Sequence, residues 1–302
     1  MSSIFYSVLG VYFFIFVGFV AKMSFKEQID DKTITIVNVY FLQVFLTFWG
    51  LLIRPVDASL AFAPIVYFGI VLIVVVVAAF GAKALFEDKK ERSIATVAAI
   101  IGNTGNLGIP INIAIFGEES IPYATIVNLV NVFVVYGIGV FYYSRGSFDA
   151  KTSLLNIVKL PVLWAALVAL ALSAYEVKPN AAIMNALMMG AYASMTMQLF
   201  LFGVYLYGAK IREVGKKLVL WVMAFKFVLL PSLAFVILAN LEMEPMIKGV
   251  VFIELMTPLA VANVNLASLY DCKPKVVASL VLLSSVAFLG IVFVAVKLLA
   301  YL

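Results

Sequence analysis

The sequence predicts an all-α integral membrane protein with ten transmembrane helices, arranged as an inverted repeat of five plus five. Of its 302 residues, 65% are hydrophobic and 12% are charged. Soluble domains carry about 45–50% apolar and about 25% charged residues, so most of this chain belongs in a bilayer. A membrane-spanning helix takes roughly 20 residues, which leaves room for about ten helices and for no large soluble domain.

Ten apolar runs, separated by charged or proline-marked breaks, supply these helices. Each run is about twice as long as the 9–11 residues of a transmembrane barrel strand, which favours helices. The first run lacks a basic segment before it and a small-residue cleavage pattern after it, so we interpret it as a retained helix and not as a signal peptide. The expected helices cover residues 3–21, 34–53, 60–86, 94–116, 121–143, 154–175, 181–208, 218–239, 246–269 and 276–299.

The distribution of basic residues predicts how the chain crosses the membrane. Sixteen of the 21 Lys and Arg residues lie in or beside the connections that follow odd-numbered helices, and three follow even-numbered helices. Basic loops stay in the cytoplasm. We therefore expect a multi-pass protein of the cell inner (plasma) membrane with both termini outside.

Composition also excludes several functions. The net charge of +5 comes from basic residues spread through short loops, which indicates topology and not a nucleic-acid partner. The single cysteine, Cys272, excludes an intrachain disulfide and a multi-cysteine metal site, and the lack of histidine excludes His-ligated metals. The sequence shows no nucleophile constellation and no nucleotide-binding loop. We therefore expect no enzyme activity and no cofactor other than a coupling ion, Na⁺ or H⁺.

An offset of 155 residues aligns unusual positions in the two halves of the chain. Gln43 falls on Gln198, Asn103 falls on Pro258, and Pro110 falls on Asn265. Because each half has five helices, the second half must enter the membrane with the opposite orientation. The two repeats are expected at residues 1–155 and 156–302.

The fourth expected helix carries the polar segment GNTGNLGIP, residues 102–110. Asn103 and Asn106 lie one turn apart and can act as a pair of amide ligands. Pro110 cannot donate to the Asn106 carbonyl, and Gly108 allows close backbone approach. An unwound stretch here exposes a half-helix N-terminus, which favours an anion. The alternative is that the small residues only allow tight helix packing.

The ninth expected helix carries a second polar, proline-containing segment. Pro258 leaves the Glu254 carbonyl without a donor, and Asn263 and Asn265 follow. Glu254 is the acidic residue placed well inside a predicted span, and such residues are commonly functional. It could hold a proton or a cation, or pair structurally with Lys226 in the eighth helix.

Other polar residues lie inside predicted spans. Asn128 and Asn131, three apart in the fifth helix, could extend the helix-4 site. Gln43 and Gln198 could belong to the site or bond neighbouring helices together. The ion-coupling candidates are Thr104, Asn128, Asn131, Glu254 and Lys226. The oxygens that could hold Na⁺ belong to Asn103, Thr104, Asn128, Glu254 and Asn263.

Four segments together resemble the auxin efflux carrier family and its bacterial relatives. They are GNTGNLGIPI from residue 102, MQLFLFGVYL from 197, KFVLLPSLAFVI from 226 and MTPLAVANVNLASLYD from 256. The family is similar in fold to bile-acid/sodium symporters. The chain departs from the plant carriers because it lacks their long loop between helices 5 and 6, and because helix 3 has no carboxylate.

The resemblance implies that the helices form two domains with different functions. A scaffold would comprise about residues 3–53 and 154–208, and a transport domain about residues 60–143 and 218–299. Helices 4 and 9 would be broken and cross near the bilayer midplane at Pro110 and Pro258. The resemblance also implies a homodimer formed through the scaffold, and an elevator-like movement of the transport domain.

These features predict a secondary active or facilitative transporter of small organic anions, with small carboxylates the class associated with bacterial relatives. Amide groups and a helix N-terminus can hold a carboxylate without a fixed cation. One alternative is a Na⁺ or other cation/proton antiporter of related fold, which needs carboxylates at the crossing; another is a non-transporting receptor. The expected partners are the anion and the lipid bilayer. The expected substrate-binding residues are Asn103, Asn106, Gly108, Pro110, Pro258, Asn263 and Asn265.

Overall fold

The computed structural model describes residues 2–52, 62–145, 152, 155, 158–177, 179–208 and 214–302, and the regular structure in these ranges is entirely helical. This confirms the predicted all-α class. Within the described ranges, six helical stretches are long and apolar enough to cross a membrane. The total of ten spans and the inverted repeat remain predictions. The six stretches are Asp31–Leu52, Phe62–Leu85, Tyr123–Arg145, Ala181–Tyr207, Lys216–Ala239 and Pro274–Tyr301.

In the first half of the chain, helices begin at capping residues and change pitch at defined points. The Asp30 side chain accepts hydrogen bonds from the backbone N–H groups of Lys32 and Thr33 and so starts the second helix. Asp88 does the same for the helix that begins at Lys89. The elements are α1 (Ser2–Phe25), η1 (Lys26–Gln28), α2 (Asp31–Val37), η2 (Asn38–Leu42), α3 (Gln43–Leu52), α4 (Phe62–Leu85), α5 (Lys89–Val97), η4 (Ala98–Ile100), η5 (Thr104–Gly108), α6 (Ile109–Phe116), η6 (Glu118–Ser120), α7 (Ile121–Phe133), η7 (Val134–Gly139) and α8 (Val140–Arg145).

The second half shows the same kind of interruption. A π-helical turn precedes Pro231, which cannot donate to the Phe227 carbonyl. A non-helical segment separates Met256 from Ala262. The elements are α10 (Pro161–Ala174), α11 (Ala181–Gly208), α12 (Lys216–Ala224), η9 (Phe225–Leu229), α13 (Leu230–Ala239), α14 (Pro245–Met256), α15 (Ala262–Leu269), α16 (Pro274–Leu298) and η10 (Leu299–Tyr301).

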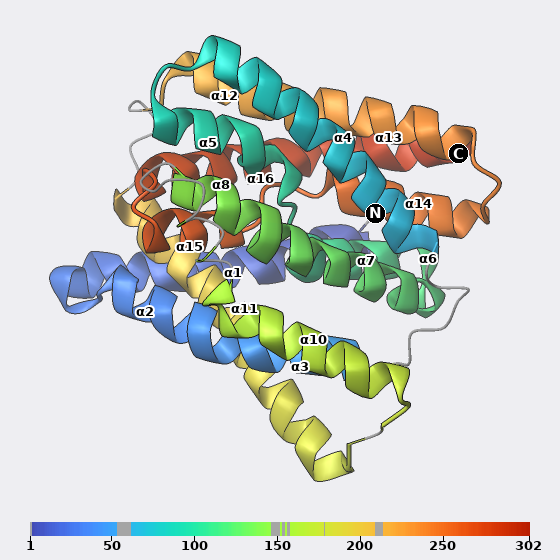
Figure 1. Ribbon diagram of the computed structural model, residues 1–302, viewed down its shortest axis with the longest axis horizontal. Helices are drawn as coiled ribbons and strands as arrows, with labels where there is room; N and C mark the ends of the chain where they lie inside the picture. The colour runs from blue at the N-terminus through green and yellow to red at the C-terminus, as the bar shows by residue number, and fades with distance from the viewer. Residues whose placement is uncertain are drawn as a thin grey trace.

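The helices pack in two groups, one above the other in Figure 1. The first group consists of α1, α2, α3, α10 and α11, in which α11 packs against both α1 and α3. The second group consists of α4 to α8 and α12 to α16, in which α4 contacts α5, α7 and α14. The groups meet where α3 contacts α7 and α11 contacts α16. The candidate site lies at this meeting place.

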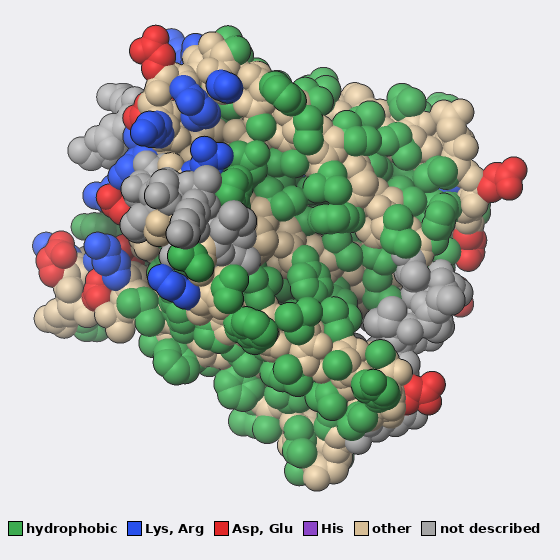
Figure 2. Space-filling view, in the orientation of Figure 1, with side chains coloured by type: hydrophobic (Ala, Val, Ile, Leu, Met, Phe, Trp, Pro, Cys, Tyr) green, Lys and Arg blue, Asp and Glu red, His purple; other side chains and the backbone are tan. Residues whose placement is uncertain are grey.

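The outer surface is apolar over much of its length and charged at its ends. Figure 2 shows hydrophobic side chains across the middle of the visible face, with Lys and Arg gathered at one end. Large apolar side chains such as Phe80, 75% exposed, and Leu220, 71% exposed, point outward, as lipid-facing side chains do. The C-terminus lies toward the end opposite the Lys and Arg side chains (Figures 1 and 2). Which end faces the cytoplasm remains a prediction.

Candidate functional site

The two interrupted helices meet backbone to backbone. Gly102 and Leu259 form an isolated antiparallel bridge. The Asn103 N–H donates to the Pro258 carbonyl at 2.8 Å, and the Ala260 N–H donates to the Ile101 carbonyl at 2.9 Å. Backbone groups freed inside a membrane protein must find partners within the protein. At each interruption, backbone groups without a helical partner therefore form hydrogen bonds with backbone groups of the other interruption.

The sequence explains where the second interruption falls. Thr257 precedes a proline, and such residues avoid the α region; its backbone is extended, with φ −51° and ψ 146°. Its hydroxyl donates to the Glu254 carbonyl at 2.7 Å. That carbonyl is the acceptor that Pro258 leaves without a helical donor.

The first interruption lies earlier than expected. The helix breaks at residues 101–103, and Pro110 is already in the first turn of α6. The π-helical turn η5 (Thr104–Gly108) runs directly into α6, and this wider turn accommodates the N–H that Pro110 lacks. The crossing therefore lies at Gly102 and Pro258–Leu259, and the expectation of a crossing at Pro110 was wrong. The side chains of Asn106 and Pro110 lie outside the described residues.

A pocket of about 170 Å³ opens beside this crossing, between α3 and α11 on one side and η5 and α7 on the other. None of its described lining residues is charged. Among the predicted site residues it brings together Asn103, Thr104, Asn128 and Asn131, with Gln43 and Gln198 on the opposite wall. The pocket therefore joins polar side chains from both helix groups.

The pocket wall formed by η5 and α7 is a hydrogen-bonded cluster. The Thr104 hydroxyl donates to Asn128 Oδ1 at 2.6 Å. Asn131 Nδ2 donates to Thr104 Oγ1 and to the Gly102 carbonyl, both at 2.9 Å, and Asn131 Oδ1 accepts from the Tyr67 hydroxyl. Asn131 thus fixes this wall, and its part in a substrate or ion site stays a prediction. The Asn103 side chain has no hydrogen bond to the described residues and can reach a ligand.

The opposite wall contains the two glutamines that the repeat aligns. Gln198 Nε2 donates to Gln43 Oε1 at 2.9 Å, and the Ser194 hydroxyl donates to the same oxygen at 3.2 Å. Both glutamines line the pocket. They therefore bond α3 to α11, which is one of the two roles left open from the sequence, and a role in the substrate site stays a prediction.

Glu254 lies in a second, fully buried cluster. Asn112 Nδ2 donates to Glu254 Oε1 at 2.8 Å and to the Gly108 carbonyl at 2.9 Å. A Cβ at Gly108 would lie 2.0 Å from Glu254 Oε2, so only glycine leaves room for this carboxylate. Glu254 Oε2 and Asn112 Oδ1 are buried with no partner among the described residues. Sequence reasoning missed Asn112, although its position one turn after Gly108 in an apolar run was a usable signal.

Lys226 does not pair with Glu254. Its Nζ donates to the Leu255 carbonyl at 3.0 Å, and within the described ranges no carboxylate lies within 4.0 Å of it. Of the roles left open for Glu254, the structural ion pair with Lys226 is therefore not seen.

The two asparagines of α15 occupy different surroundings. Asn263 Nδ2 donates to the carbonyls of Ile101 and Ala260, and its Oδ1 accepts from the Tyr143 hydroxyl at 2.8 Å. Asn263 therefore holds the crossing together, with both amide donors and its oxygen bonded inside the protein. Asn265 is buried, and its Oδ1 has no partner in the described part of the chain. The oxygens predicted to hold Na⁺ thus fall into separate clusters around Thr104, Glu254 and Asn263.

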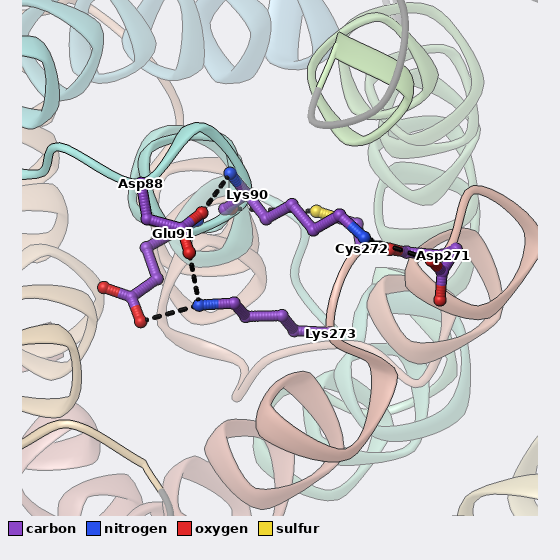
Figure 3. Close-up of polar contacts among 6 residues, drawn as sticks. All are labelled: Asp88, Lys90, Glu91, Asp271, Cys272 and Lys273. Atoms are coloured by element: carbon purple, nitrogen blue, oxygen red, sulfur yellow. Dashed lines mark hydrogen bonds and ion pairs between the residues drawn. The ribbon is translucent and has the colours of Figure 1, made fainter.

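A charged cluster at the basic end joins α5 to the connection before α16 (Figure 3). Lys273 lies between Asp88, at 2.7 Å, and Glu91, at 2.9 Å. Lys90 contacts Asp271 at 3.1 Å. The Lys273 ammonium beside Asp88 holds the pKa of that carboxyl below its usual range. Burial raises the pKa of the neighbouring Cys272 thiol to about 12, so this thiol is protonated and unreactive at neutral pH.

Comparison with known proteins gives two matches. A family model described as "Membrane transport protein" matches residues 3–296. A protein of Methanocaldococcus jannaschii, described as an uncharacterized transporter, is 26% identical over 227 residues. That alignment covers 74% of this chain and 73% of the archaeal protein.

Proposed function

The chain belongs to the membrane transport protein family, which confirms the predicted resemblance to the auxin efflux carriers, and we propose that it transports small organic anions through the pocket beside the helix crossing. The observation that carries this proposal is the pocket itself. It is uncharged over its described lining, amide-rich, and placed where two interrupted helices meet. Interrupted helices at a central crossing are characteristic of transporter binding sites.

The chemistry of the pocket suits a carboxylate. The helix that follows Asn103 begins with N–H groups that have no helical acceptor, because the Leu107 and Gly108 N–H groups are the first to bond back to Asn103. Thr104 and Gly105 line the pocket. Helix N-termini and amide NH₂ groups are ready donors to an anion. Asn103 and Asn128 would supply those amides.

The position of the pocket between the two helix groups supports alternating access. Its walls come from α3 and α11 on one side and from η5 and α7 on the other. If the second group slides against the first as an elevator, the ligand moves with η5 and α7 while the opposite wall stays behind. This proposal includes the inverted ten-helix repeat and a homodimer formed through the first group.

Glu254 is the proposed site of ion coupling. A buried carboxylate without a paired cation is costly, so this cluster needs a proton or a monovalent cation. The unpartnered Glu254 Oε2 and Asn112 Oδ1 are the oxygens that either would use. Uncoupled transport driven by the membrane potential would leave Glu254 permanently protonated.

The proposal is tested with purified protein in proteoliposomes. Uptake of mono- and dicarboxylates is measured with and without Na⁺, a pH gradient and a membrane potential. Asn103→Ala should lower carboxylate transport at least about tenfold, because a charge-assisted hydrogen bond is lost. Asn240→Ala, at an exposed position at the end of α13, is the matched control and should transport normally. Cation-for-proton exchange indifferent to every carboxylate would instead establish the antiporter.

A further inference from the structure

We propose that Lys226 determines the charge selectivity of the pocket, because its amine lies directly behind Gly102 and carries a positive charge when an anion occupies the pocket. The pocket would then prefer carboxylates to their neutral amide isosteres. This inference rests on the proposed function and adds to it a residue that does not line the pocket itself.

The geometry places the Lys226 ammonium next to the wall of the pocket. Gly102 lines the pocket. A Cβ at Gly102 would lie 3.2 Å from Lys226 Nζ and 2.7 Å from Thr257 Oγ1. Because Gly102 has no side chain, little more than its backbone separates the ammonium from a ligand. A charge so close acts strongly in a poorly hydrated interior.

A positive charge on Lys226 has few bonding partners among the described residues. Lys226 is 1% exposed, and an ammonium has three donors. Among the described residues its Nζ donates to one acceptor, the Leu255 carbonyl. That carbonyl belongs to the last turn of α14, whose partial negative charge offsets the ammonium only in part. An anion in the pocket would complete the compensation.

The buried carboxylate of α14 contacts other residues than Lys226 does. The Glu254 carboxylate contacts Asn112 and crowds Gly108, whereas Lys226 lies against Gly102 and Leu255. The Glu254 carboxylate therefore lies against Gly108 and the Lys226 amine against Gly102. Of these two glycines, Gly102 lines the pocket and Gly108 does not.

Local structure turns Lys226 inward. It lies in the π-helical turn η9, which ends two residues before Pro231. The wide turn accommodates the missing N–H of Pro231. Such π-turns inside α-helices are frequent at functional sites. A structural reading, in which Lys226 merely caps α14, predicts no preference between charged and neutral ligands.

The test compares malonate and malate with the neutral isostere malonamide. Transport of radiolabelled malonate or malate into proteoliposomes is measured, with malonamide and each unlabelled acid as competitors. Lys226→Gln and Lys226→Met should weaken competition by the acids by about tenfold or more, and malonamide should compete as well as before or better. Lys226→Arg should retain acid selectivity. Lys248→Gln, which removes a buried lysine at the start of α14, is the matched control and should behave as wild type.

Each outcome bears on the inference. Both neutral variants are checked for folding by size-exclusion chromatography. If they fold and the unlabelled acids compete for transport as well as they do in wild type, Lys226 does not set selectivity. If competition by the acids and competition by malonamide weaken equally, Lys226 has a packing role and the inference is overturned. If Lys226→Gln fails to fold, the charge-conserving Lys226→Arg and the apolar Lys226→Met decide between charge and packing. Wild-type protein that transports no carboxylate would refute the proposed function instead.

Discussion

At the scale of single residues, Glu254 and Asn112 are where a coupling ion can be detected. Glu254→Gln removes the charge but keeps the shape and the contact with Asn112. If Na⁺ or H⁺ binds here, the stimulation of transport by an ion gradient should fall at least about tenfold in this variant. Exchange of substrate in the absence of a gradient should persist. Proteoliposome uptake with and without each gradient measures this. Unchanged ion dependence would remove Glu254 from the mechanism.

Gly108 is the residue whose missing side chain makes room for that carboxylate. Gly108→Ala would place a Cβ 2.0 Å from Glu254 Oε2, so the carboxylate must move from Asn112. We expect a loss of stability of about 1–3 kcal/mol together with loss of transport. Gly69→Ala, where an added Cβ meets no atom within 4 Å, should be neutral or stabilising by up to about 1 kcal/mol. Thermal unfolding of the two variants in detergent compares them; equal unfolding temperatures would contradict the crowding at Gly108.

At the scale of helical elements, the two interruptions depend on Asn263. Its amide bonds Ile101 and Ala260 and accepts from Tyr143. Asn263→Ala leaves buried groups unpaired and should cost about 2–4 kcal/mol of stability. Tyr143→Phe removes one of these bonds and should cost about 1 kcal/mol. A larger loss in Tyr143→Phe than in Asn263→Ala, measured by thermal unfolding, would show that Asn263 does not hold the crossing.

The same elements show what the sequence could and could not predict. Glycines, asparagines and prolines in apolar runs located both interruptions, because such residues are costly in a continuous membrane helix. Proline position alone misplaced the first crossing, since Pro110 is accommodated after the π-helical turn η5 and the break precedes both. The contact of Asn112 with Glu254 and the lack of an ion pair between Lys226 and Glu254 could not be predicted, because both depend on how α6, η9 and α14 pack in space.

The charged cluster at the end of α5 gives a pH-dependent prediction. Hydrogen bonding to Lys273 lowers the pKa of Asp88 in the folded protein, so this contact stabilises the fold above the unfolded pKa of about 3.9. The contribution is lost as pH falls through the still lower folded pKa. Asp88→Asn should therefore be less stable than wild type at pH 7, and the difference should vanish in strong acid. The effect should be small and salt-sensitive because the pair is partly exposed. The unfolding temperatures of wild type and Asp88→Asn are compared at pH 7 and pH 3. A difference between the two proteins that grows in acid would contradict the prediction.

At the scale of the whole molecule, the proposed elevator requires that the two helix groups move past each other. One buried apolar cluster offers a direct test, because it contains Leu51 of α3, Leu129 of α7 and Ala166 of α10. In a Cys272→Ser background, cysteines at Leu51 and Leu129 join the two groups, and oxidation should stop transport until a reductant is added. Cysteines at Leu51 and Ala166 join helices within the first group, so oxidation should leave transport unchanged. Gel mobility after cleavage between the paired positions reports cross-linking, and uptake is measured on the same vesicles. Normal transport by the fully cross-linked first pair would mean that substrate crosses without relative movement of the groups, since the walls of the pocket belong to both.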